Sequence, residues 1–233
     1  MSDMLVMTGG SRGIGAETIN LFVEQGWQAI NLSRSPCSNP SVININVDLA
    51  VPLNRTQHAG QLEALVAGAS RIALVHNAAA FERDNVTSLT ESRLRAVLEL
   101  NIVAPVALNT LLLPYMKAGS SIIYIGSTLS EMAVSNRASY VISKHAMVGL
   151  MRSTCQDLAG TEIVTTCICP GFVNTDMLTS QMEETALQAL VKQKVTQGRL
   201  IEPEEIASLI YFCATHAVMN GEVIHANLGQ VAS

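Results

Sequence analysis

The stretch MLVMTGGSRGIG, residues 4–15, decides the fold of this chain. It opens with an apolar run of the length of a buried strand, and Gly9, Gly13 and Gly15 follow in the pattern GxxxGxG before an amphipathic segment. Glycines at this spacing allow a tight turn and a close approach of the backbone to a pyrophosphate, which the N-terminus of the next helix holds. The stretch therefore predicts a dinucleotide-binding α/β domain.

The rest of the chain repeats this alternation of short apolar runs and longer amphipathic segments. The ranges predicted as strands are 4–7, 28–32, 42–47, 72–75, 121–125, 163–168 and 222–225. The ranges predicted as helices are 14–25, 56–67, 90–116, 139–159 and 203–214. Runs rich in Val, Ile and Leu indicate strands that are buried on both faces. We therefore expect one Rossmann-type domain over residues 1–233, a doubly wound parallel sheet of about seven strands with helices on both faces.

Residues 175–199 interrupt the alternation with a Met-rich, helix-forming segment that follows the sixth predicted strand. This end of a parallel sheet is where open α/β folds bind their ligands. We expect the segment to be a substrate lid, and an ordinary pair of surface helices is the alternative.

The composition excludes several classes of protein. Hydrophobic residues make up 48% of the 233 residues and charged residues 14%, with a mean hydropathy of +0.31, so the chain can bury a large core and is not disordered. A formal net charge of −5 offers no basic surface for nucleic acid. The apolar runs are too short to span a membrane, and an acid stands where a signal peptide carries basic residues. We expect a cytoplasmic protein with no membrane partner.

The five cysteines are odd in number and form no CxxC pair. Cys167 and Cys169 are two residues apart, so on a strand they would share one face, but no second pair of ligands accompanies them. We therefore expect reduced cysteines that pack as small hydrophobic side chains, and no metal site.

The end of the second predicted strand indicates which dinucleotide is bound. In NAD-binding domains an acid about 20 residues after the glycine turn binds the ribose 2′-hydroxyl. Ser33 and Arg34 stand at that strand end instead, and Arg12 lies in the glycine turn itself. A hydroxyl and guanidinium groups suit a 2′-phosphate, so the sequence favours NADP(H) over NAD(H). The alternative is that both arginines are merely solvated.

The stretch YVISK, residues 140–144, predicts a site of proton transfer. On a helix, Tyr140 and Lys144 lie on one face. An ammonium close to a phenol favours the phenolate and lowers the pKa of the Tyr, which suits a general acid or base near neutral pH. A half-buried Tyr beside a surface Lys is the alternative. Ser127 follows the strand at 121–125, so its side chain emerges at the ligand-binding edge of the sheet.

Asn101 lies four residues before Pro105 in the helix predicted at 90–116. Proline cannot donate to the carbonyl at i−4, so the backbone oxygen of Asn101 needs another partner, and we expect a bound water near a kink. A kink that serves packing alone is the alternative.

These motifs, in this order, resemble the short-chain dehydrogenase/reductase family in its compact single-domain form, over nearly the whole chain. TGGSRGIG (8–15) resembles the cofactor turn, HNAA (76–79) the family's NNAG motif, and PGFVNT (170–175) the segment beside the nicotinamide. Asp48 matches the acid that contacts the adenine ring. The resemblance implies that the cofactor is bound by Gly9, Ser11, Arg12, Gly13, Ile14, Gly15, Ser33, Arg34, Asp48, Leu49, Asn77, Ala78, Tyr140, Lys144, Pro170, Gly171, Val173 and Thr175.

The resemblance also implies a catalytic tetrad of Asn101, Ser127, Tyr140 and Lys144. Tyr140 would be the general acid or base on the substrate oxygen, and Lys144 would lower its pKa and bind the nicotinamide ribose. Ser127 would position the carbonyl, and Asn101 would hold a water that connects Lys144 to solvent. The expected activity is NADP(H)-dependent reduction of a ketone or aldehyde to an alcohol, or the reverse. The alternatives are an NAD-dependent alcohol dehydrogenase and a non-catalytic nucleotide-binding sensor.

Apolar residues surround much of the helices at 90–116 and 139–159, so one domain core cannot cover every face. Relatives that resemble this chain pair through these two helices. We expect a homotetramer, or a homodimer, that acts on a small carbonyl or alcohol substrate.

Three positions depart from the common family pattern. Ala79 replaces the last Gly of NNAG, which is tolerable if φ is not positive there. Leu228 replaces a glycine near the C-terminus, which bears on the conformation of the tail. Glu131 lies in a stretch that lines the substrate in relatives, and we expect it at the rim rather than facing the substrate, since charged side chains are seldom buried unpaired.

Overall fold

Seven parallel strands form one sheet in the computed structural model, which describes residues 2–180 and 182–230. The order across the sheet is β3-β2-β1-β4-β5-β6-β7, so the chain reverses its direction of travel between β3 and β4. The strands are β1 (Met4–Thr8), β2 (Gln28–Ser33), β3 (Val42–Asn46), β4 (Ile72–His76), β5 (Ser121–Ile125), β6 (Val164–Pro170) and β7 (Val223–Ala226). The reversal places a crevice at the carboxyl ends of β1 and β4, where such folds bind nucleotides.

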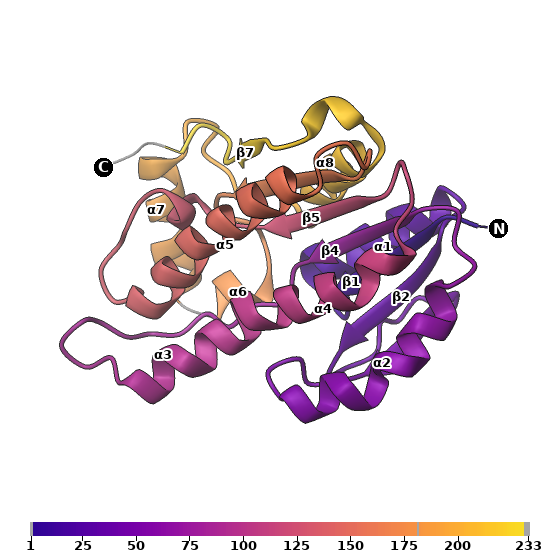
Figure 1. The fold of residues 1–233 in the computed structure, drawn as a ribbon. Helices are drawn as coiled ribbons and strands as arrows, with labels where there is room; N and C mark the ends of the chain where they lie inside the picture. Colours follow the sequence, from indigo (N-terminus) through magenta and orange to yellow (C-terminus); the bar gives the residue numbers. More distant parts are fainter. Residues whose placement is uncertain (1, 181, 231–233) are drawn as a thin grey trace.

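Helices cover both faces of this sheet (Figure 1). The helices are α1 (Gly13–Glu24), α2 (Pro52–Val66), α3 (Glu91–Leu98), α4 (Ala104–Leu112), α5 (Ala138–Asp157), α6 (Asp176–Thr179), α7 (Glu184–Lys194) and α8 (Pro203–Thr215). Figure 1 shows α2, α4 and α5 in front of the sheet, where Leu62, Leu108 and Met151 enter one core cluster. Phe22 of α1 and Ile210 of α8 belong to the cluster on the opposite face. The predicted doubly wound α/β fold is confirmed.

The predicted strands and helices agree with the structure to within a few residues, with one difference in kind. The helix predicted at 90–116 contains a π-helical turn, Glu99–Val103, and ends in a 3₁₀ turn, Leu113–Tyr115. In the π turn the amide of Ala104 donates to the carbonyl of Glu99, five residues earlier. Pro105 has no amide hydrogen for the carbonyl of Asn101, and the wider turn lies where that bond is missing.

The helical stretch Glu91–Tyr115 is long and apolar enough to cross a membrane by length and composition alone, contrary to the sequence expectation. Core helices of soluble proteins pass the same test. In this fold α3 and the π turn pack against α5, and α4 packs against α2. Ala104, Leu108 and Leu112 enter the core.

A buried polar network lies between the sheet and helices α4 and α5. His76 ends β4, and its Nε2 lies 2.8 Å from Oδ1 of Asn109. Nδ2 of Asn109 donates to the hydroxyl of Tyr124 at 2.7 Å, and that hydroxyl lies 3.1 Å from Oγ1 of Thr154. His76 Nδ1 has no hydrogen-bond partner among the described residues. Burial lowers the pKa of His76 from 6.5 to about 4, against the opposing effect of its bond with Asn109.

We expect this imidazole to make the free energy of unfolding depend on pH. Between pH 6.5 and about 4 the unfolded chain binds a proton that the folded His76 refuses, so stability falls as the pH drops through that window. The shift corresponds to about 3 kcal/mol. The free energy of unfolding should be measured by chemical denaturation at pH 7 and at pH 4. Its decrease between the two pH values should be smaller for His76→Asn than for wild type. His58→Asn, at a half-exposed histidine of α2, should lose as much as wild type. Equal losses in wild type and His76→Asn would contradict this prediction.

Candidate active site

A cleft of about 1280 Å³ opens at the carboxyl ends of the strands. It is lined by nearly every residue for which the sequence predicts cofactor contact: Gly9, Ser11, Arg12, Gly13, Ile14, Ser33, Arg34, Asp48, Leu49, Asn77, Ala78, Tyr140, Lys144, Pro170, Gly171, Val173 and Thr175. Ser127 lines the same cleft. Gly15 and Asn101 do not line the cleft. Both are buried behind the residues that do.

The glycine turn is shaped so that side chains would block it. Gly9 has φ +67° and Gly13 φ +53°, both in the left-handed region that favours glycine. A Cβ on Gly15 would lie 2.1 Å from the carbonyl oxygen of Gly9, so only glycine lets the start of α1 approach the turn. A Cβ on Gly13 would lie 3.0 Å from Cγ2 of Thr175. The bare backbone at a helix N-terminus fits a dinucleotide pyrophosphate.

Two asparagines, one in β2 and one just after β4, hold the glycine turn from the strands on either side of β1. Oδ1 of Asn31, buried in β2, accepts from the amide of Gly10 at 2.9 Å. Nδ2 of Asn77 donates to the carbonyl of Gly9 at 3.0 Å, and its backbone amide donates to Oγ1 of Thr8 at 2.9 Å. The sequence analysis missed Asn31, although an asparagine between Ile30 and Leu32 in the strand QAINLS is a visible signal.

Positive charge lies at the corner of the cleft near the end of β2. Ser33 and Arg34 line this corner, and the Arg34 side chain is exposed. The Ser33 hydroxyl donates to the carbonyl of Ser35 at 2.5 Å. Arg12, at the N-terminus of α1, pairs with Asp176 at 3.3 Å, and both side chains are mostly exposed. The expected basic groups are therefore present, although Arg12 already has an acidic partner.

Three members of the predicted tetrad meet at the other end of the cleft. Ser127 follows β5, and its Oγ accepts from the amide of Leu129 at 3.1 Å. Tyr140 lies in the first turn of α5 with its ring buried. Nζ of Lys144 is buried, donates to the carbonyl of Ile125 at 2.6 Å and lies 5.4 Å from the centre of the Tyr140 ring.

The expected lowering of the Tyr140 pKa by Lys144 is not found. Burial raises the pKa of Tyr140 to about 12, against the opposing effects of the Ser127 hydroxyl and the charge of Arg137. Burial also lowers the pKa of Lys144 to about 8. Both shifts have one cause, because a buried site disfavours the charged form of either group. The ammonium contacts the carbonyl of Ile125 and the face of the phenol ring, where it favours the phenolate less than it would beside the hydroxyl.

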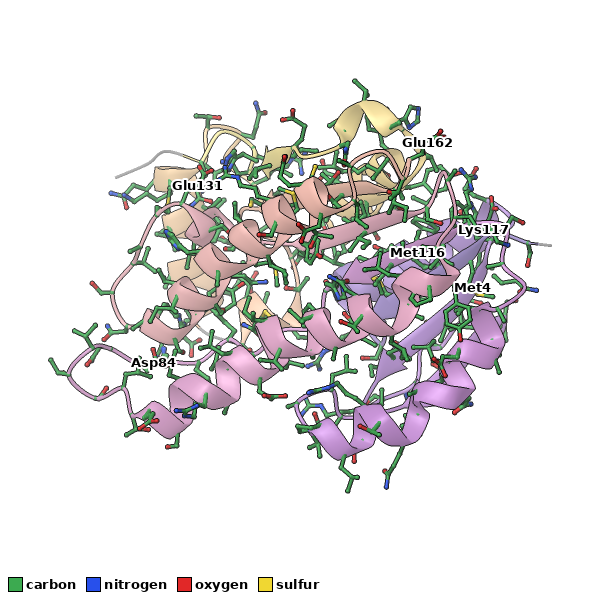
Figure 2. All side chains as sticks on the ribbon, viewed as in Figure 1. Met4, Asp84, Met116, Lys117, Glu131 and Glu162 are labelled. Carbon is green, nitrogen blue, oxygen red and sulfur yellow. The ribbon has the colours of Figure 1, made fainter. Side chains whose placement is uncertain are left out.

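Two polar anchors fix the start of α5, and with it Tyr140. The carboxylate of buried Asp84, labelled in Figure 2, accepts from the amide of Ser139 at 2.9 Å and from its hydroxyl. The hydroxyl of Ser143 donates to the carbonyl of Tyr140 at 2.8 Å and accepts from Nδ2 of Asn101 at 2.9 Å. Asp84 and Asn101 are far from α5 in the sequence, so their bonds tie the start of this helix to two distant segments.

Asn101 differs from the other tetrad members because its side chain is fully buried outside the cleft lining. Its Oδ1 accepts from the amide of Ala80 at 2.8 Å, and its Nδ2 donates to the carbonyl of Ala80 at 3.1 Å. With the bond to Ser143, the amide joins the segment after β4 to α5. The side chain thus positions its neighbours, and the π turn lies at the backbone carbonyl that was predicted to lack a partner.

The sequence analysis missed two residues of this end of the cleft, Phe81 and Arg137. The ring of Phe81 packs edge-on against that of Tyr140, with centroids 4.6 Å apart. The guanidinium of Arg137 lies 4.1 Å from the centre of the Phe81 ring. The position of Arg137, three residues before Tyr140 at a helix start, was the available signal.

The segment predicted as a lid borders the cleft. It contributes seven residues to the lining: Thr175, Asp176, Met177, Leu178, Met182, Leu190 and Lys194. Leu187, Val191 and Val195 form a separate small apolar cluster, against which Phe172 and Leu228 pack. The segment therefore packs on an apolar cluster that is distinct from the two clusters on the faces of the sheet.

The cysteines lie where small hydrophobic residues are expected. Cys37, Cys167, Cys169 and Cys213 are buried and unpaired, and Cys155 is half-buried. Sγ of Cys167 and Sγ of Cys169 lie 3.9 Å apart on one face of β6. A Cβ on Gly126 would come within 2.9 Å of both sulfur atoms, which explains the glycine before Ser127. Within residues 2–180 and 182–230, no group of three or more His, Cys, Asp or Glu side chains could hold a metal ion.

The three departures from the family pattern have different outcomes. Ala79 does not have a positive φ, so its Cβ is tolerated. Leu228 has φ +51°, a left-handed conformation that favours the glycine it replaces, and its carbonyl accepts from the hydroxyl of Thr196 at 2.9 Å. Glu131, labelled in Figure 2, lies outside the cleft lining and pairs with His225 at 3.1 Å. It does not face the substrate cleft, as expected.

Comparison with known proteins agrees with this geometry. The family model described as enoyl-(acyl carrier protein) reductase matches residues 9–230. Protein FixR of Bradyrhizobium diazoefficiens is 31% identical over 244 residues, which cover 97% of this chain and 86% of that protein.

Two solved structures share the fold. A 4-hydroxyisoleucine dehydrogenase complexed with NADH superposes with a TM-score of 0.90 at 23% identity, over 99% of both chains. A 3-oxoacyl (acyl-carrier-protein) reductase from Agrobacterium tumefaciens C58 with NADP bound superposes with a TM-score of 0.87 at 25% identity, over 97% of this chain and 93% of that one. The glycine cradle, the cleft at the switch point of the sheet and these matches lead to one conclusion. The chain belongs to the short-chain dehydrogenase/reductase family of NAD(P)-dependent oxidoreductases.

Proposed function

We propose that the protein is an NADP(H)-dependent reductase that converts a ketone or aldehyde to an alcohol, with Tyr140 as the general acid. One observation carries this proposal: Ser127, Tyr140 and Lys144 line the same cleft as the glycine turn. A nucleotide whose pyrophosphate lay on that turn would extend along the cleft that these three side chains also line. A non-catalytic sensor would have little need of them.

The bound nicotinamide nucleotide supplies the hydride. Ser127 Oγ accepts from the amide of Leu129, and its hydroxyl interacts with that of Tyr140, so both hydroxyls can act on one substrate oxygen. Tyr140, whose pKa is about 12, stays protonated at neutral pH and can donate its proton to the oxygen of a reduced carbonyl. The same phenol serves both directions: it donates its proton in reduction, and as the phenolate it accepts the proton of an alcohol in oxidation.

The test is a screen of ketones and aldehydes for oxidation of NADPH by the purified protein. Turnover of any carbonyl compound above the rate of the Tyr140→Phe variant supports the proposal. Tight NADPH binding without turnover on any carbonyl compound or alcohol would favour the non-catalytic alternative. Preferential turnover of alcohols with NAD⁺ would favour an NAD-dependent dehydrogenase.

We further propose a cytoplasmic enzyme that acts as a single domain, with residues 175–199 as a lid over the substrate. The lid proposal is supported by the seven residues of the segment that line the cleft and by the Arg12–Asp176 pair, which joins it to the glycine turn.

A homotetramer is expected in solution. Val103 and Val106 in the α4 region and Ile142 on α5 are each 42–43% exposed, which leaves apolar surface on the two helices that the domain core does not cover. Light scattering at micromolar concentration should give four times the monomer mass, 24.9 kDa, or twice that mass for a dimer. Ile142→Glu should dissociate the assembly, and Val218→Glu, at an exposed site after α8, should not. A wild-type monomer would rule this assembly out.

A further inference from the structure

A mostly buried ion pair joins the first turn of α2 to the π turn after α3. Nη2 of Arg55 lies 2.6 Å from Oε1 of Glu99, and 11% and 28% of the two side chains are exposed. The two residues are 44 positions apart, and neither lines the cleft. The helix dipole disfavours a cation in the first turn of a helix, so the stability of α2 does not explain Arg55.

Arg55 also holds the segment that follows β3. Its Nη1 donates to the carbonyl of Leu49. Leu49 is buried and lines the cleft together with Asp48 and Ala50. Within this segment, Oδ1 of Asp48 accepts from the amide of Ala50 at 3.0 Å. The guanidinium of Arg55 therefore ties a local turn in the cleft wall to a distant helical segment.

Glu99 belongs to a segment that borders the cleft as well. Ala96 and Leu100, close to Glu99 in the same helical stretch, line the cleft. The backbone carbonyl of Glu99 accepts the hydrogen bond that closes the π turn. The Arg55–Glu99 pair thus holds two segments of the cleft wall together, one of which carries Asp48, the acid expected to contact the adenine ring.

We propose that Arg55 is a positioning residue for the adenine ring of the bound nucleotide, an inference that rests on the NADP(H) binding proposed above. By bonding to Leu49 and Glu99 at once, the guanidinium fixes the spacing between the two segments that the ring enters. A planar group with five donors can make both bonds in a fixed geometry. Since Arg55 does not line the cleft, its effect falls on the affinity for the nucleotide and not on the chemical step.

The first test is Arg55→Met, which removes both bonds and keeps most of the side-chain volume. The Kd of NADPH, measured by fluorescence titration, should rise about tenfold, in keeping with the loss of hydrogen bonds made by a charged group. The Kd of NADH should rise by the same factor, because both nucleotides carry the adenine ring. A change in the ratio of the two affinities would show that Arg55 acts on the 2′-phosphate, and would overturn the inference.

A second variant separates positioning from stability. Arg55→Met should lower the midpoint of urea denaturation, because it leaves the mostly buried carboxylate of Glu99 without its partner. Adding Glu99→Met replaces the pair by apolar side chains and should restore most of the midpoint, but not the bond to the carbonyl of Leu49. NADPH affinity should therefore stay low in the double variant. Recovery of wild-type affinity together with stability would overturn the inference.

Arg71→Met is the matched control. Arg71 pairs with Asp3 at 2.7 Å, their side chains are 33% and 27% exposed, and neither residue lines the cleft. This variant should lower the denaturation midpoint and leave both Kd values within about twofold of wild type. Arg55→Lys should recover part of the NADPH affinity, since an ammonium restores the charge without the planar fork. Equal weakening of NADPH binding by Arg55→Met and Arg71→Met would overturn the inference.

These measurements need no carbonyl substrate, so the inference and the reductase function can fail separately. Tight nucleotide binding without turnover overturns the reductase function alone, and the comparison of Kd values then still decides the role of Arg55. Where a carbonyl compound is reduced, kcat of Arg55→Met at saturating NADPH should stay within about twofold of wild type. A loss of kcat as large as that of Tyr140→Phe would place the effect in the chemical step and overturn the inference.

Discussion

Tyr140→Phe should lower kcat by about 10²–10⁴-fold and leave the dissociation constant of NADPH within about twofold of wild type. The substitution removes only the hydroxyl. The edge-on contact with Phe81 at 4.6 Å and the burial of the ring are kept, so the local packing should survive. Single-turnover kinetics with saturating NADPH measure the chemical step, and fluorescence titration of NADPH measures binding. Activity near that of wild type would overturn the role of Tyr140 as the general acid.

Lys144→Ala is the companion variant, because one ammonium is expected to serve two purposes. It should weaken NADPH binding, through loss of the ribose contact, and slow the chemical step as well. The side chain is buried and bonded to the carbonyl of Ile125 at 2.6 Å, so Lys144→Met, which keeps most of its volume, controls for a packing defect. Normal NADPH affinity in both variants would remove the ribose contact from the mechanism.

The features that could be predicted from the sequence are those that local order determines. Gly9, Gly13 and Gly15 lie within one turn, and Tyr140 and Lys144 lie within one helix, so spacing along the chain fixes their arrangement. Alternation of apolar runs then fixed the number of strands, because both faces of a parallel sheet are buried.

The features that the sequence analysis missed depend on contacts between distant segments. The bonds of Asp84 with Ser139 join residues 55 positions apart, and those of Asn101 with Ser143 join residues 42 apart. No pattern within either segment indicates its partner. The direction of the Tyr140 pKa was wrong for a related reason: helical spacing places an ammonium near a phenol but does not show how deeply both are buried.

Wild type should bind NADPH at least about tenfold more tightly than NADH, and Ser33→Asp with Arg34→Ala should reverse that order. A tenfold preference needs only about 1.4 kcal/mol, less than one charge-assisted hydrogen bond supplies when it is partly desolvated. Ser33 and Arg34 both line the cleft at the end of β2, the position of the ribose-binding acid in NAD enzymes. The new carboxylate would repel a 2′-phosphate and accept from a 2′-hydroxyl. Isothermal titration with both cofactors measures the two affinities.

The contribution of Arg12 is tested separately, because its guanidinium pairs with Asp176 at 3.3 Å. Both side chains are more than 70% exposed, and exposed ion pairs contribute at most about 1 kcal/mol, so a dianionic phosphate can compete for Arg12. Asp176→Asn should therefore leave NADPH affinity unchanged or raise it slightly. Arg95→Ala, at an exposed arginine of α3, is the control for general charge.

The preference for NADPH should shrink as salt rises, because exposed charges are screened. Equal affinities for NADPH and NADH in wild type would show that Arg12 and Arg34 are only surface charges. Position 33, which carries a serine and no acid, would then admit both cofactors without selecting either.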